Sequence, residues 1–168
     1  SRCGMVWVDP QNLGYRPYYE RWVRTRLGNG VDIPEEKQPA AELLLALYDR
    51  YVPRCIDLIL SGMVDGEMGQ KLKQVIPITN IDMLKQLCSV IDAHLSLDIV
   101  DPVDIEYLYI YSCVWSLGAA LVGSARHKLD SFLKKLSREP LPDGILYDYF
   151  YDVTMRRWEK WQSLVPAY

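Results

Sequence analysis

The sequence lacks the motifs with which proteins commonly hold phosphates, activate a serine or bind catalytic zinc. Its 168 residues contain no G-x-x-x-x-G-K-[ST], no G-x-G-x-x-G, no G-x-S-x-G and no H-E-x-x-H. The two histidines, His94 and His127, stand alone, without a second ligand at helical or hairpin spacing, so we expect no metal site. From these absences we predict that the chain on its own is not an enzyme.

An excess of positive charge is also missing. The chain has 19 Lys and Arg residues against 22 Asp and Glu, which gives a formal net charge of -3. This balance leaves no surplus of cations for phosphates and argues against nucleic acid as a partner. The apolar stretch 105–122 is long enough to raise a membrane span, but Glu106 and the flanking Asp101 and Asp104 oppose it. We predict a buried helix there instead, and no membrane partner.

Paired cysteines are the next absence. The cysteines form no C-x-x-C pair and are far apart in the sequence, at Cys3, Cys55, Cys88 and Cys113. Such usage is typical of a reducing compartment, in which thiols serve as small buried apolar groups.

What the sequence does contain is helical periodicity. Apolar residues recur every three or four positions over 40–60, which predicts an amphipathic helix even though Pro53 lies inside it. An earlier helix is expected from Pro17 to about Leu27, after a loop at 13–17. Three more helices are expected after residues of the capping type, namely Thr79, Asp101 and Ser124.

Strand formers gather at the two ends of the chain. Residues 5–8 predict a short strand, and residues 146–151 and 157–161 predict an aromatic β-hairpin. The expected fold class is therefore mainly α, a helical bundle with a short N-terminal strand and a C-terminal β-hairpin. We expect three parts, 1–16, 17–139 and 140–168. Because the chain starts within a residue or two of a strand, we interpret it as a piece of a larger protein.

Residues that could support catalysis are few. Asp98, Asp101 and Asp104 could be a general acid and base, but the last two have the positions of helix-capping acids. A small hydrolase would need a nucleophile beside a base, and the sequence offers only Cys88 or Cys113 with a distant histidine. Neither pattern favours an active site.

Residues 1–10 (SRCGMVWVDP) are followed by L-G-Y-R-P-Y at 13–18 and by Trp22. Farther on stand 111–118 (YSCVWSLG), 126–133 (RHKLDSFL), 147–149 (YDY) and 158–166 (WEKWQSLVP). The first group resembles the end of the large subdomain of the second AAA+ module in dynein heavy chains. The later groups resemble the lid, or small subdomain, of that module and its exit toward the third module. The D-P-x-x-L-G-Y-x-P-Y run is similar to axonemal rather than cytoplasmic dyneins.

The resemblance implies a mechanical role for the chain and a direct part in catalysis for one residue, Arg2. It identifies 1–16 as the end of a large subdomain, 17–139 as a AAA+ lid and 140–168 as a hairpin and linker to the next module. It places Arg2 as an arginine finger that completes the ATP site of the neighbouring module. Such a finger contributes about 10³ to 10⁵ in rate.

The resemblance also implies which lid residues approach nucleotide. It places Trp115, Leu117 and Gly118 nearest the nucleotide held by the second module. Arg126 is a weak candidate for a second sensor arginine, and the lack of a better one fits a module that binds ATP without hydrolysing it. The implied cofactor is ATP or ADP with Mg²⁺ in the parent motor, with none bound tightly by this chain alone.

Further implications concern partners and place in the cell. The resemblance implies neighbouring AAA+ modules of the same heavy chain as partners, and microtubules and other dynein subunits through the parent motor. The implied location is the cytoplasm, cytoskeleton and ciliary axoneme, where the parent would drive minus-end-directed motility. A different hypothesis is a free-standing helical adaptor that binds a partner through the 40–60 helix and has no nucleotide role.

Overall fold

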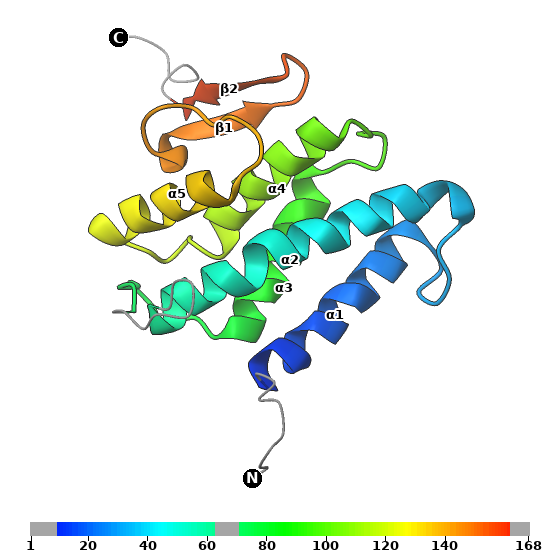
Figure 1. The fold of residues 1–168 in the computed structure, drawn as a ribbon, viewed down its shortest axis with the longest axis horizontal. Helices are drawn as coiled ribbons and strands as arrows, with labels where there is room; N and C mark the ends of the chain where they lie inside the picture. Colours follow the sequence, from blue (N-terminus) through cyan, green and yellow to red (C-terminus); the bar gives the residue numbers. More distant parts are fainter. Residues whose placement is uncertain (1–9, 63–70, 162–168) are drawn as a thin grey trace. The chain divides into compact units, whose positions relative to one another are not determined.

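The computed structural model describes residues 10–62 and 71–161, and this part of the chain is mainly helical (Figure 1). Its elements are α1 (Pro10–Leu27), α2 (Gln38–Ser61), α3 (Asn80–His94), α4 (Pro102–Ser116), α5 (Ser124–Leu136), β1 (Tyr149–Asp152) and β2 (Arg157–Lys160). Short 3₁₀ helices cover Glu35–Lys37 and Leu146–Asp148. The predicted class, a mainly α fold with a C-terminal β-hairpin, is confirmed. The strand expected at 5–8 lies outside the described residues.

The first helix begins earlier than predicted. The loop expected at 13–17 is wrong, because the backbone is helical from Pro10 onward and Pro17 lies inside α1. Pro10 suits the first helical position, where an N–H has no intrahelical partner to lose and the fixed φ matches the helix. The predicted start at Pro17, and with it the expected boundary at 16/17, falls within this helix.

The chain divides into two compact units, Ser1–Leu45 and Ala46–Tyr168. In the first unit α1 buries Tyr19, Val23 and Leu27, which are one helical turn apart. The Tyr19 hydroxyl donates a hydrogen bond to the Leu44 carbonyl at 2.7 Å. Tyr18 and Trp22, also on α1, are half-buried.

In the second unit α4 is the central helix. It is buried nearly all round, as predicted, and contacts α3, α5, β1 and the 3₁₀ helix at Leu146–Asp148. The largest fully buried side chains of this unit include Tyr109 of α4 itself and, on α2 and α3, Tyr51, Ile56, Ile59, Met83, Leu84, Leu87 and Ile91. The apolar side of the predicted 40–60 helix, now α2, is part of this core.

Two of the three predicted helix caps are confirmed. The Thr79 hydroxyl accepts from the backbone N–H of Asp82 at 3.3 Å, and the Asp101 carboxylate accepts from that of Val103 at 2.9 Å. The Ser124 cap is wrong, since Gly123 is the capping residue and forms no side-chain bond. Gly123 has φ +53°, a left-handed value that glycine adopts without steric cost.

The fourth helix ends before its apolar run does. The run was expected to be helical to residue 122, but α4 stops at Ser116 and the chain turns back at 117–120. Leu121 then forms an isolated antiparallel bridge with Gln74, and the Val75 N–H donates to the Ala120 carbonyl at 2.7 Å. Periodicity could not mark this end, because the residues after it are as apolar as those before.

The hairpin has a simple register. β1 and β2 are antiparallel, with Tyr149 opposite Lys160 and Tyr151 opposite Trp158. The first three residues of the predicted strand 146–151 form a 3₁₀ turn instead. On α4, the Tyr107 ring lies 4.9 Å from the Tyr151 ring and 5.5 Å from the Trp158 ring, centroid to centroid. The hairpin thus packs its aromatic side chains against the central helix, and Figure 1 shows it lying beside α4.

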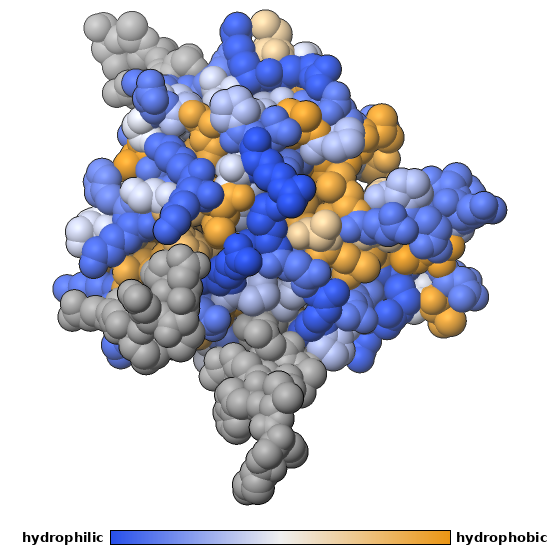
Figure 2. All heavy atoms as spheres, viewed as in Figure 1, coloured by the Kyte–Doolittle hydropathy of each residue, from blue (hydrophilic) through white to orange (hydrophobic). Residues whose placement is uncertain are grey.

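The exposed positions of α2 include Glu42, Asp49 and Arg54, as its amphipathic pattern predicts. Figure 2 shows hydrophilic side chains over much of the visible face, with apolar side chains between them. Among the described residues, no helix combines the length and hydropathy that a membrane crossing requires.

Candidate functional site

Leu117 and Gly118 form a tightly packed turn at the end of α4. Leu117 is 1% exposed, and the hydroxyl of Tyr147 donates to the Gly118 carbonyl at 2.7 Å. A Cβ added at Gly118 would lie 2.3 Å from the Tyr147 hydroxyl oxygen and 2.5 Å from Leu129 Cδ2. Glycine is required here by close approach, because any side chain would displace two buried neighbours.

Trp115, unlike Leu117 and Gly118, is partly exposed to solvent. It is half-buried, and its ring meets the Tyr147 ring edge-on at 5.6 Å and the Trp161 ring at 6.4 Å. Its indole N–H is buried and has no hydrogen-bond acceptor among the described residues. A buried N–H without a hydrogen bond is costly, so an acceptor placed beside the Trp115 indole would be stabilising.

Arg126 reaches the same turn from the start of α5. Its Nε donates to the Leu121 carbonyl at 2.9 Å, and its guanidinium lies 4.6 Å from the centre of the Tyr147 ring. Burial raises the pKa of Tyr147, against the opposing effect of Arg126. The fold therefore brings the candidate second sensor close to Trp115 and Gly118, and uses it to hold Tyr147 in place.

A small pocket adjoins this cluster. It has a volume of about 310 Å³ and is lined by Tyr147, Asp148, Lys160 and Trp161. Two aromatic faces, one carboxylate and one ammonium group can together bind a flat polar group. Sequence reasoning did not find this pocket, because its lining comes from both the 3₁₀ helix and the end of β2.

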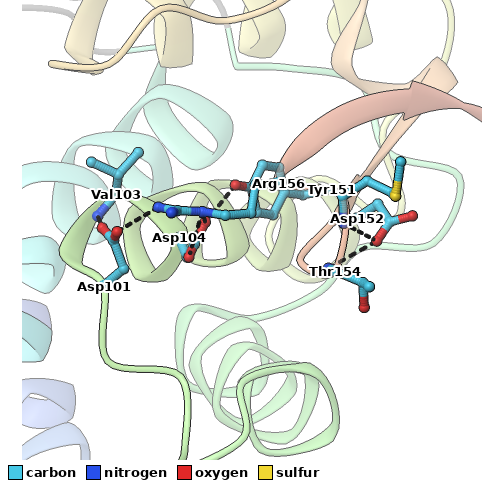
Figure 3. Close-up of polar contacts among 8 residues, drawn as sticks. Asp101, Val103, Asp104, Tyr151, Asp152, Thr154 and Arg156 are labelled. Carbon is cyan, nitrogen blue, oxygen red and sulfur yellow. Dashed lines mark hydrogen bonds and ion pairs between the residues drawn. The ribbon is translucent and has the colours of Figure 1, made fainter.

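A second cluster fixes the hairpin to the other end of α4 (Figure 3). We call Asp101, Asp104, Tyr151 and Arg156 the hairpin clamp. Arg156 is the last residue of the turn between β1 and β2, and it forms ion pairs with Asp101 and, at 3.3 Å, with Asp104. The Tyr151 hydroxyl donates to the Asp104 carboxylate at 2.5 Å. Strand β1 and the turn of the hairpin are thereby tied to the start of α4.

The clamp explains the shifted ionisation of its members. The Val103 N–H, and then Arg156, lowers the pKa of Asp101, while the Asp101 carboxylate is the main cause that raises the pKa of Arg156. Burial, helped by the bond to Asp104, raises the pKa of Tyr151. Asp101 and Arg156 therefore keep the opposite charges that pair them at neutral pH, and Tyr151 keeps the proton that it donates.

A third anchor joins the middle of α4 to α2. Glu106, which is 6% exposed, accepts from Arg50 at 2.9 Å and from the Tyr51 hydroxyl at 2.7 Å. The Arg138 N–H also points at this carboxylate, at 3.4 Å. A buried carboxylate needs such partners, since removing one leaves an uncompensated charge. The helix is thus held along its whole length.

The thiols and carboxylates that the sequence offers as catalytic candidates have structural surroundings. Burial raises the pKa values of Cys55 and Cys88 to about 12 and that of Cys113 well above its usual value, which suppresses the reactive thiolate. Asp101 and Asp104 have their partners in the hairpin clamp. Within residues 10–62 and 71–161, no three His, Cys, Asp or Glu side chains are grouped as a metal site. Arg2 lies outside the described residues.

The fold and these anchors define a helical domain of the lid type, in which a buried central helix carries a hairpin at one end and a packed turn at the other. Residues 44–163 match the family model described as "Dynein heavy chain AAA lid domain". The chain belongs to this family.

Related heavy chains match over the whole length of this chain. It is 36% identical over 183 residues to human "Dynein axonemal heavy chain 10", and the match covers 100% of the chain. It is 34% identical over 185 residues to "Dynein-1-alpha heavy chain, flagellar inner arm I1 complex" of Chlamydomonas reinhardtii, again over 100% of the chain. The chain spans about 4% of the length of each of these relatives.

Proposed function

We propose that this chain is the lid of the second AAA+ module in an axonemal dynein heavy chain, with residues 1–16 ending the large subdomain and 140–168 leading to the third module. The observation that carries this proposal is the family match over residues 44–163, joined to whole-chain similarity with axonemal heavy chains. The choice of module rests on the two groups of motif residues, 1–10 and 111–118.

The proposed work of the domain is to transmit motion. Three anchors hold α4 against α2 and the hairpin, so a force on the packed turn at Gly118 would move the hairpin with it. Packed cores shift between discrete arrangements and do not deform continuously, which suits a part that passes rotation from one module to the next. In the ring, the outer face of the hairpin would contact the following module.

Nucleotide would be held mainly by the large subdomain, with the lid closing over it. Of the residues proposed to lie nearest, Trp115 has accessible surface and an unused donor, whereas Leu117 and Gly118 would act by shaping the turn. The cofactor would be ATP or ADP with Mg²⁺, bound in the parent motor and not tightly by this chain alone. Partners would be the adjoining modules and, through the parent, other dynein subunits and microtubules of the ciliary axoneme.

Arg2 is proposed as the arginine finger of the preceding module. A guanidinium presents a rigid fork of donors that stays charged, and this suits it to stabilise phosphate charge in a transition state. Carried over from the resemblance, this role would make Arg2 worth about 4 to 7 kcal/mol of barrier, the equivalent of 10³ to 10⁵ in rate.

The test replaces Arg2 with Ala in the complete heavy chain that contains this segment. We expect the ATPase rate and microtubule gliding velocity to fall steeply, because the neighbouring site loses its transition-state cation. Arg2→Lys should rescue little, since lysine lacks the fork. Arg21→Ala, an exposed arginine on α1, is the matched control and should leave both rates unchanged. Normal gliding by the Arg2→Ala motor would refute the finger.

The adaptor hypothesis is not supported by the burial of α2. It requires the apolar side of the 40–60 helix to be available, but Tyr51, Cys55 and Ile59 on α2 are fully buried within the second unit. The lid proposal needs that side inside the core, which is where it lies.

A further inference from the structure

An exposed apolar segment lies between the packed turn and the start of α3. Val75 and Ile76 are 68% and 69% exposed, and Pro77 after them is exposed as well. Among the large apolar side chains that the structure describes as exposed, these are the only two that follow each other in the sequence. We call residues 75–77 the apolar ridge. A run of exposed apolar residues is unusual on a protein surface unless it serves an interaction.

The apolar ridge is held in place at both ends. Before it, Leu72 is 5% exposed, and its N–H donates to the Ile59 carbonyl at 3.0 Å. The Val75 N–H donates to the Ala120 carbonyl at 2.7 Å. After the ridge, the Thr79 side chain caps α3. Because the ridge is already ordered, a partner that binds it has little conformational entropy to remove.

The apolar ridge is also joined to the packed turn, the part of the domain that is proposed to approach nucleotide. Gln74, directly before the ridge, forms an antiparallel bridge with Leu121. The Leu121 N–H in turn donates to the Gly118 carbonyl at 3.2 Å. A surface that covers the ridge would therefore also limit where the packed turn can lie.

The size of the apolar ridge decides what kind of partner can cover it. A stable interface between two free proteins buries about 800 Å² on each side, which three side chains cannot supply. A partner in the same polypeptide needs far less area, because the covalent link raises its effective concentration to the millimolar range. The chain spans about 4% of the length of the heavy chains that it matches, so a heavy chain of that kind has ample polypeptide to provide the partner.

We propose that the apolar ridge packs into an apolar groove on an adjoining AAA+ module of the same heavy chain. The inference rests on the proposed function and adds to it a contact at the packed turn, separate from the hairpin. Burial of Val75 and Ile76 in the groove removes apolar surface from water, which favours the docked position. Because so few side chains take part, the contact is weak enough to break and re-form as the lid moves.

The test is photocrosslinking in the complete heavy chain that contains this segment, with benzoylphenylalanine in place of Val75. We expect the crosslinked peptides, identified by mass spectrometry, to come from an adjoining AAA+ module of the same chain. Ile76→Asp in this protein should lower the crosslinked fraction several-fold, because docking would then bury a carboxylate in an apolar groove. The same change should leave the melting temperature of the 168-residue chain unaltered, since Ile76 is exposed there.

Val100→Asp is the matched control. Val100 is 79% exposed and lies in the loop between α3 and α4. The change therefore adds the same charge at an exposed apolar position outside the ridge. We expect it to leave the crosslinked fraction from position 75 unchanged.

Three results would overturn the proposal. Absence of crosslinks from position 75 would mean that the ridge is open to solvent in the motor. Crosslinks to a second copy of the heavy chain, or to a different protein, would assign the ridge to an intermolecular contact. Equal losses in Ile76→Asp and Val100→Asp would reduce the effect to added charge. The Arg2→Ala motor tests the lid proposal without involving the ridge, so the two proposals fail separately.

Discussion

Gly118 and Gly123 are five residues apart, and each requires glycine for a different physical reason. Gly123 has φ +53°, and a Cβ added there would meet no atom within 4 Å, so a side chain would be strained by the backbone alone. Gly118 has no such φ, but an added Cβ would meet Tyr147, Leu129 and the Val114 carbonyl. The first glycine serves a turn, and the second lets the end of α4 come close to the 3₁₀ helix.

Replacing Gly118 with Ala should therefore destabilise the fold by overpacking, by about 1 to 3 kcal/mol in the free energy of unfolding. Tyr147→Phe alone should cost about 1 kcal/mol, because the Gly118 carbonyl loses its buried donor. The same change in the Gly118→Ala background removes the atom closest to the new methyl, and we expect it to cost less there or to stabilise. Urea unfolding of all four proteins in a double-mutant cycle measures the coupling. Strictly additive effects would mean that the two residues do not touch.

The sequence gives little warning of such residue-level features. Gly118 stands in an apolar helical run, and its neighbour Tyr147 is 29 positions away. Arg156 is similar, since it has φ +55°, a conformation that favours glycine or asparagine over arginine. Its partner Asp101 is 55 positions away, and the sequence indicates only a helix cap there. Contacts between residues far apart in the sequence leave no pattern among neighbouring residues that could predict them.

At the scale of elements, the hairpin depends on α4 for its position. A two-stranded hairpin is only marginally stable by itself in water, and here the clamp and the Tyr107, Tyr151 and Trp158 rings hold it. Tyr151 takes part in both, since its ring packs on Tyr107 and its hydroxyl bonds to Asp104. It is the residue through which the attachment can be tested without removing apolar packing.

Tyr151→Phe should lower the free energy of unfolding by about 1.5 to 3 kcal/mol, the range for a hydrogen bond to a charged partner. Tyr149→Phe is the matched control in the same strand. The hydroxyl of Tyr149 donates to the Asp143 carbonyl at an exposed position, so its loss should cost less than about 0.5 kcal/mol. Chemical denaturation gives the energies, and hydrogen exchange should show the hairpin amides of Tyr151→Phe opening before those of α3. Equal effects of the two changes would exclude the clamp as the attachment.

Local chemistry predicted elements better than it predicted their ends. Thr79 and Asp101 were identified as caps because each type of side chain bonds its own backbone two or three residues ahead. Ser124 was not a cap, since the positive φ of Gly123 could not be anticipated from its neighbours. The end of α4 at Ser116 was missed for a different reason, namely that burial on all sides leaves no polar face whose interruption would mark it.

At the scale of the whole molecule, three helices each place a cysteine in the core of the second unit. Cys55 of α2, Cys88 of α3 and Cys113 of α4 are free thiols and are buried, as the sequence predicted. Cys3 lies outside the described residues. Because the three thiols belong to different helices, their ionisation reports the integrity of the core as a whole.

The thiols should make the fold less stable in alkaline solution. Burial raises the pKa of Cys55 from 9.0 to about 12, so the folded state favours the neutral thiol. This contribution is fully present below the unfolded pKa near 9 and is lost as the pH rises toward the folded value, because only the unfolded chain then releases the proton. Between pH 8 and pH 10.5 one such thiol should account for about 2 kcal/mol of lost stability.

The comparison that isolates this effect is Cys55→Ala against the parent, both carrying Cys3→Ser. The alanine variant should be the less stable protein at pH 8, because it leaves a small cavity. Its stability should nevertheless fall by about 2 kcal/mol less between pH 8 and pH 10.5, since the titrating thiol is gone. Ser89→Ala, an exposed change on α3, should keep the parent's full fall. Urea unfolding at the two pH values measures all three, and parallel falls in parent and Cys55→Ala would show that the Cys55 thiol ionises as readily in the folded core as in the unfolded chain.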